Sequence, residues 1–246
     1  MGELKDKVIS GVKWNAIGRF STQGVNFIIG LILARLLSPS DYGVVGMVGI
    51  FFAIAQTFID SGFGSALIRK NDVTDTDYST AFYFNILVGL VCCILLCATS
   101  PFIANFFNTP ILKDLVKVMS LNMFISSFAI VHAAKLTHSV DFKSQAIVNL
   151  VTAILSGSIG ILMAYKGFGV WSLVFQQLIA TVLRVIFLYV VTKWLPKLEF
   201  SGNSFRYLFN FGSKILFSSL LHTIYANMTT LIIGKFYSPK ELGYYS

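Results

Sequence analysis

Arg35-Leu-Leu-Ser-Pro-Ser-Asp-Tyr-Gly43 is the stretch that decides the fold, because it returns 200 positions later as Lys235-Phe-Tyr-Ser-Pro-Lys-Glu-Leu-Gly243. Serine, proline, an acidic residue and glycine stand in register in the two copies. Each copy follows a long apolar segment and is typical of a helix end followed by a capped helix start. Repetition at a long period is typical of transporters built by internal duplication. The sequence therefore predicts one complete repeat and the beginning of a second.

The composition indicates a membrane protein. Hydrophobic residues make up 55% of the 246 residues and charged residues only 12%, against about 25% charged residues in a soluble domain. The mean hydropathy is +0.74. The net charge of +8 comes from lysines and arginines that lie between apolar segments instead of on one basic face. This distribution argues against nucleic acid as a partner.

Apolar windows long enough to cross a bilayer divide the chain. A spanning helix needs about 20 residues, because each adds about 1.5 Å across a hydrocarbon core about 30 Å thick. Seven windows qualify, at 14–37, 44–68, 79–104, 115–134, 145–165, 169–192 and 208–236. The gaps hold capping and helix-breaking residues, and none is long enough for a soluble domain. The predicted fold is an all-α polytopic membrane protein.

The distribution of positive charge predicts the orientation of these helices. Lysine and arginine are more frequent in the segments that face the cytoplasm if the N-terminus is inside. We expect a cytoplasmic N-terminus (1–13), a six-helix N-terminal lobe (14–192), a cytoplasmic linker (193–207) and the first helix of a second lobe (208–246). The chain would then be a truncated form of a two-lobe protein. Six helices return the chain to its starting side, so both copies of the turn should lie on the outer side.

The candidate substrate path consists of polar or charged side chains inside apolar helices. Its members are Asn15, Arg19, Gln23, Asn26, Asp60, Arg184, Lys214 and His222. The first four recur every three or four residues, so they share one face of the first helix, and Lys214 and His222 belong to a similar stripe on the last helix. We expect these two faces to line one wet cavity. Hydrogen bonding between packed helices is the alternative.

Four ionisable residues lie at comparable depth inside predicted spans, where a charge is costly and usually faces a cavity or a partner. Arg19, Asp60, Arg184 and Lys214 all fall within about 6–14 Å of the cytoplasmic end at 1.5 Å per residue. They predict a net cationic vestibule, and the planar fork of arginine suits a phosphorylated headgroup. Snorkelling to the interface is the alternative for Lys214. We also expect Arg19 and Asp60 to form an ion pair while the cavity is empty.

Two further patterns have a simpler structural interpretation. Asp75-Thr-Asp77 has the spacing by which some sugar transferases hold a metal, but it follows Thr74 at the start of an apolar run and favours a helix N-cap. Gly43, Gly46 and Gly49 form a small-residue stripe that favours close helix packing. Neither the histidines nor the cysteines have the spacing of a metal site. The sequence predicts no metal, no cofactor and no catalytic residue.

Four stretches carry a resemblance to a known family by their order and spacing. They are Ala34-Arg-Leu-Leu-Ser-Pro-Ser-Asp-Tyr-Gly43, Asp60-Ser-Gly-Phe-Gly-Ser-Ala-Leu-Ile68, Asp141-Phe-Lys-Ser-Gln-Ala146 and Gly167-Phe-Gly-Val-Trp-Ser-Leu-Val174. With them the whole chain resembles the polysaccharide (Wzx-like) flippases of the multidrug/oligosaccharidyl-lipid/polysaccharide (MOP, MATE-like) exporter superfamily. The resemblance implies a six-helix lobe of a MATE-like transporter, followed here by the first helix of the second lobe.

The resemblance also implies a function. Such a protein moves undecaprenyl-pyrophosphate-linked oligosaccharide from the cytoplasmic to the periplasmic leaflet of the bacterial inner membrane by alternating access, for lipopolysaccharide or exopolysaccharide synthesis. Its partners would be the lipid-linked oligosaccharide, membrane lipids and other polysaccharide-assembly proteins, and coupling to an ion gradient is left open. Two alternatives stand beside it. One is a small-molecule cation or drug exporter of the same superfamily, and the other is a membrane-embedded glycan-processing enzyme or assembly partner.

Overall fold

The computed structural model describes residues 2–60, 62–70 and 72–245, and this part of the chain is helical throughout with short connections. The helices are α1 (Gly2–Leu36), α2 (Pro39–Asp60), α3 (Phe63–Arg69), α4 (Asp75–Phe106), α5 (Leu112–His138), α6 (Phe142–Tyr165), α7 (Val170–Thr192), α8 (Gly202–Phe236) and α9 (Pro239–Tyr245). Taking α2 and α3 as one span, seven segments of the described chain are long and apolar enough to cross a membrane. The predicted all-α membrane fold is therefore confirmed.

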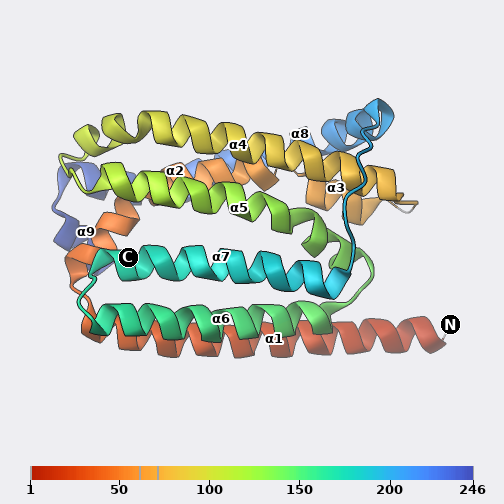
Figure 1. Cartoon of the computed structure of the whole chain (residues 1–246), viewed down its shortest axis with the longest axis horizontal. Helices are drawn as coiled ribbons and strands as arrows, with labels where there is room; N and C mark the ends of the chain where they lie inside the picture. Colours follow the sequence, from red (N-terminus) through yellow and green to blue (C-terminus); the bar gives the residue numbers. More distant parts are fainter. Residues whose placement is uncertain (1, 61, 71, 246) are drawn as a thin grey trace.

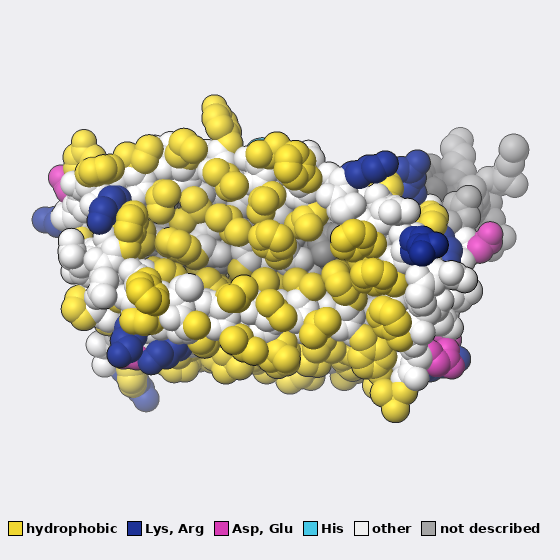
Figure 2. All heavy atoms as spheres, turned by 90° about the horizontal axis from the view of Figure 1, so that it is seen from above, with side chains coloured by type: hydrophobic (Ala, Val, Ile, Leu, Met, Phe, Trp, Pro, Cys, Tyr) yellow, Lys and Arg dark blue, Asp and Glu magenta, His cyan; other side chains and the backbone are white. Residues whose placement is uncertain are grey.

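The long helices lie side by side in one bundle (Figure 1). α1 packs along α6, α6 along α7, α7 along α5 and α5 along α4, while α2 contacts α4 and α5 on one side and α8 on another. Large hydrophobic side chains cover the middle of the face seen in Figure 2, and lysines and arginines gather toward its two ends. Such an apolar surface between charged ends is what a bilayer requires.

The predicted second span is not one continuous helix. α2 ends at Asp60 and α3 begins at Phe63, and Gly62 between them has a left-handed φ of 69°. A Cβ on Gly62 would lie 2.6 Å from the carbonyl oxygen of Gly212 in α8. Glycine is required here both for the backbone conformation and for the close approach of another helix. The contact lies at the break, and the apolar pattern of 44–68 reveals neither of them.

The two copies of the repeated turn face each other at one end of the bundle. In each copy a serine amide and hydroxyl donate to the acidic side chain three residues later, at 2.9 and 2.7 Å from Ser38 to Asp41 and at 2.8 Å each from Ser238 to Glu241. Both are capping boxes that begin the next helix. A Cβ on Gly43 would lie 1.7 Å from the Pro239 oxygen, and one on Gly243 would lie 1.6 Å from the Pro39 oxygen. The duplicated motif therefore packs reciprocally against itself.

The segment that joins α7 to α8 is shorter than the predicted linker and is held against the N-terminal end of α4. α8 begins at Gly202 instead of 208, after the cap residue Ser201. The indole Nε1 of Trp194, which is 7% exposed, donates to Asp75 at 3.2 Å, and the amide of Lys197 donates to the Ser79 hydroxyl at 3.0 Å. The amide of Ser201 donates to the hydroxyl of Thr80 at 3.1 Å. These bonds fix the segment 193–201 against α4.

Two weaker predictions have different outcomes. Thr74 and Asp77 form a complete capping box at the start of α4, which confirms the N-cap interpretation, and Asp75 interacts with basic side chains of α5 and the linker. The glycine stripe of α2 is only partly a packing surface. Gly43 makes the reciprocal contact, whereas nothing lies within 4 Å of a Cβ placed on Gly49. Close packing at Gly49 was therefore predicted wrongly.

Candidate functional site

A cavity of about 1400 Å³ lies between α1, α6 and α7. Most of its polar lining comes from amides and hydroxyls that can bind a sugar or water. The polar and charged residues that line it are Asn15, Arg19, Thr22, Gln23, Asn26, Thr137, Gln145, Asn149, Thr152, Ser156, Gln176, Gln177 and Arg184. Apolar side chains such as Phe20 and Phe142 complete the wall. The cavity therefore offers hydrogen bonds and apolar contact at the same place.

Small residues allow the helices to pack closely behind this polar surface. A Cβ on Gly18 would lie 2.4 Å from the Cβ of Ala146, so α1 and α6 are in close contact at this level. Arg19 follows Gly18 by one residue, which turns its side chain about 100° around the helix, away from the contact. Gly160 of α6 similarly accommodates the side chain of Gln176 from α7. Small residues thus allow α1, α6 and α7 to pack closely, and the polar residues of these helices line the cavity.

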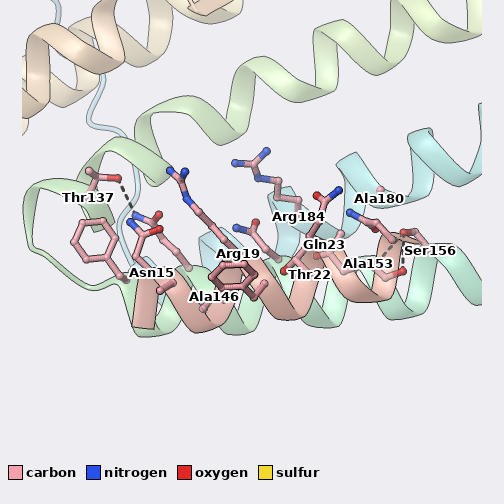
Figure 3. A pocket seen from close by; sticks show the side chains of 18 of the residues that line it. Asn15, Arg19, Thr22, Gln23, Thr137, Ala146, Ala153, Ser156, Ala180 and Arg184 are labelled. Carbon is pink, nitrogen blue, oxygen red and sulfur yellow. Dashed lines mark hydrogen bonds between the residues drawn. The ribbon is translucent and has the colours of Figure 1, made fainter. Parts of the chain in front are cut away.

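The charge of the cavity is positive. Among the described residues that line it, Arg19 and Arg184 are the charged ones, and no aspartate or glutamate is present. The two guanidinium groups come from α1 and α7 and extend in the same direction, away from the α1–α6 pair (Figure 3). Both side chains are exposed to the cavity. Two guanidinium groups in a site surrounded by apolar helices favour binding of a multiply charged anion such as a phosphate ester.

A second cavity, of about 700 Å³, lies between α2, α3, α5, α7 and α8. Asp60 lines it, and its Oδ1 accepts a hydrogen bond of 3.0 Å from Nε2 of Gln56. Oε1 of Gln56 accepts in turn from the Ser126 hydroxyl at 3.3 Å. Arg184 lines this cavity as well as the first, and its charge interacts with that of Asp60. Asp60 and Arg184 are the charged groups among the described residues of this second cavity.

The structure brings five of the eight candidate residues together. Asn15, Arg19, Gln23, Asn26 and Arg184 line the first cavity. The polar residues that α6 contributes were missed, although Gln145, Asn149, Thr152 and Ser156 follow the same spacing of three or four residues that was recognised on α1.

The other three candidates lie outside the first cavity, and their place in a substrate path stays a prediction. Asp60 lines the second cavity together with Arg184, and the expected ion pair between Arg19 and Asp60 is not formed among the described residues. Lys214 and His222 are exposed on α8 and line neither cavity. The reason is the packing of the helices, since α1 lies along α6 whereas α8 lies along α2 (Figure 1). The two polar stripes therefore do not face each other.

Comparison with known proteins agrees with this architecture. A solved multidrug resistance transporter of the MATE family, in its inward-facing conformation, matches with a TM-score of 0.61 over 91% of this chain and 56% of its own, at 14% identity. This likeness establishes the fold, which is that of a MATE transporter lobe.

Sequence relatives place the chain more narrowly. It is 26% identical to the teichuronic acid biosynthesis protein TuaB of Bacillus subtilis over 100% of its length and 51% of the relative's. It is 26% identical to the succinoglycan biosynthesis transport protein ExoT of Rhizobium meliloti, over 97% of this chain and 48% of the relative. It is 24% identical to the lipopolysaccharide biosynthesis protein WzxC of Escherichia coli, over 99% of this chain and 50% of the relative. The chain thus spans about half the length of these relatives. Residues 32–246 match the family described as polysaccharide biosynthesis protein, and the chain belongs to that family.

Proposed function

We propose that this chain forms the substrate-binding lobe of a flippase that moves undecaprenyl-pyrophosphate-linked oligosaccharide from the cytoplasmic to the periplasmic leaflet of the inner membrane. In this proposal the N-terminus is cytoplasmic, and alternating access is produced by movement of this lobe against a second one. The observation that carries the proposal is the first cavity, in which two arginines and no described acidic residue stand among many amide and hydroxyl groups.

The chemistry of the cavity matches the three parts of such a substrate. Arg19 and Arg184 would neutralise the pyrophosphate, and the fork of each guanidinium can bind two phosphate oxygens. Asn15, Gln23 and Asn26 would bind the glycan or its water. Apolar residues on the same wall, such as Phe20, would contact the polyprenyl chain near the headgroup. Membrane lipids and other polysaccharide-assembly proteins would be its partners.

The alternative functions fit this cavity less well. An exporter of cationic drugs needs acidic groups in the binding cavity, but the one acidic candidate, Asp60, lies in the second cavity next to Arg184. A metal-dependent glycan-processing enzyme would need Asp75 and Asp77 free to bind the metal. Asp77 accepts hydrogen bonds from Thr74 and lies 2.6 Å from the ammonium of Lys70. Both acids therefore already have structural roles at the start of α4.

A flipping assay with a matched pair of variants tests the proposal. Arg19→Ala should lower the rate at which proteoliposomes containing the protein translocate a lipid-linked oligosaccharide by about tenfold or more, because a charge-assisted hydrogen bond contributes about 1.5–3 kcal/mol. Arg35→Ala removes the same charge from the exposed end of the same helix, outside the cavity, and should leave the rate unchanged. Equal rates for both variants would remove Arg19 from the site.

A further inference from the structure

Arg184 is the one charged residue that lines both cavities in the described chain. Its place on α7 explains this position, because α7 packs against α6 on one side and against α5 on the other. The first cavity lies on the α6 side and the second reaches α5, α2 and α8. A long flexible side chain at the boundary can direct its guanidinium to either side. The charged and hydrogen-bonding groups of the two cavities therefore decide which cavity the guanidinium occupies.

The second cavity offers hydrogen-bond acceptors to Arg184. A guanidinium has five donors and no acceptor, so it requires oxygen atoms around it. The carboxylate of Asp60 is held in place by Gln56, and Oδ1 of Asn122 is buried in the cavity wall without a hydrogen-bond partner, in a side chain that is 7% exposed. A buried oxygen without a partner is costly and favours a donor that reaches it. The carboxylate of Asp60 is thus the charged acceptor that the second cavity offers the guanidinium.

Asp60 in turn needs a cation. It is the last residue of α2, where the helix dipole is negative and the carboxylate is destabilised. Among the described residues of the cavity, α3, α5 and α8 contribute no ionisable side chain, and α7 contributes Arg184. The first cavity holds a second cation, Arg19, and no described carboxylate. In the absence of an anionic ligand, Asp60 is therefore the group that attracts Arg184.

We propose that Arg184 alternates between Asp60 in the second cavity and an anionic phosphate group in the first, so that the two anions compete for one guanidinium. The inference rests on the proposed function, because it takes the first cavity as the phosphate site. Binding of a pyrophosphate group draws Arg184 away and leaves Asp60 without its counter-charge. Asp60 lies two residues before Gly62, which contacts Gly212, and α8 lines the same cavity through Ile215, Leu216 and Ser219. Occupancy of the first cavity is thereby transmitted to the α2–α8 contact.

The test is a double-mutant cycle measured with inorganic pyrophosphate on the purified protein in nanodiscs. Asp60→Asn removes the competing charge and should lower the dissociation constant about fivefold or more, within the range of coupling between two sites. Arg184→Gln should raise the constant. In the Arg184→Gln background, Asp60→Asn should change it by less than about twofold, because the residue that transmits the competition is gone. Asp114→Asn, an exposed acid on α5 outside both cavities, changes the net charge equally and should have no effect.

The outcomes separate this inference from the proposed function. If the wild-type protein does not bind pyrophosphate, or if Arg19→Ala and Arg184→Gln bind it as the wild type does, the phosphate site itself is refuted. If binding depends on both arginines but Asp60→Asn leaves it unchanged, only the competition is refuted. The competition is also refuted if Asp60→Asn changes the dissociation constant equally with and without Arg184. That result would show that the charge of Asp60 acts on the cavity over a distance, without Arg184. A thermal melt of each variant shows that it remains folded.

Discussion

The reciprocal contact between the two copies of the repeated turn predicts a large loss of stability when Gly43 is changed to alanine. The added Cβ would lie 1.7 Å from the carbonyl oxygen of Pro239, and 2.6 Å from its carbonyl carbon. A carbon and a carbonyl oxygen normally stay about 3.3 Å apart or more. The neighbouring atoms are backbone, so they cannot move away by a change of rotamer. α9 would have to retreat from α2 by about 1.5 Å.

This displacement sets the magnitude. Overpacking a tight interface costs about 1–3 kcal/mol, and a gap of 0.5–1 Å already loses a quarter to a half of the dispersion energy along a contact. We expect Gly43→Ala to lower the free energy of unfolding by about 3 kcal/mol. Gly243→Ala should cost about the same, because its Cβ would lie 1.6 Å from the Pro39 oxygen. The double variant should cost less than the sum, since one separation of the helices relieves both clashes.

The measurement is unfolding of the purified protein in detergent, followed by far-UV circular dichroism. Gly49→Ala is the matched control on the same helix, because nothing lies within 4 Å of its added Cβ. That control should be neutral or more stable by about 0.5–1 kcal/mol, since alanine favours a helix more than glycine does. Equal stabilities of Gly43→Ala and Gly49→Ala would refute the reciprocal contact. Additive effects in the double variant would show that the two clashes are independent.

Two further predictions concern the contacts that hold α8 and the linker. Trp194→Phe keeps an aromatic ring but removes the donor to Asp75, so it should lower the free energy of unfolding by about 1 kcal/mol and speed proteolysis of 193–201. Leu198→Ala is the control, because this side chain is 96% exposed, and it should change neither the stability nor the proteolysis. Thr57→Val removes the hydroxyl that lies 3.1 Å from that of Thr223 and should cost about 0.6 kcal/mol, which thermal unfolding in detergent can measure. An unchanged melting temperature would contradict this contribution to the α2–α8 contact.

Several of the residues that carry the family resemblance form turns and caps in the structure. Asp141 caps α6 by accepting from the amide of Ser144 at 3.1 Å, and Gly167 and Gly169 have φ values of 81° and 54° between α6 and α7. None of these contacts involves Arg19. Motifs of this kind identify a fold because turn geometry restricts the residue type at each position. They leave the substrate to be argued from the cavity.

Helical periodicity predicted the cavity-lining residues of α1 but not those of α8. Spacing alone placed Asn15, Arg19, Gln23 and Asn26 on one side of α1, and all four line the first cavity. The same reasoning applied to α8 selected Lys214 and His222, which line neither cavity. Periodicity identifies residues that share a face, but it contains no information about the neighbour of that face. On α8 the residues that reach a cavity begin one position later, at Ile215.

The sequence by itself determined that the protein lies in a membrane, and it also determined the seven apolar spans, the duplicated capped turn and the polar face of the first helix. Each of these features depends on composition or on residues close together along the chain. Only the tertiary structure decided which faces meet. The break before α3 and the separation of α1 from α8 depend on contacts such as that of Gly62 with Gly212, which are far apart in sequence. The position of Arg184 between a carboxylate and a cationic cavity depends on the packing of α7 against helices from both cavities, and no local pattern records that arrangement.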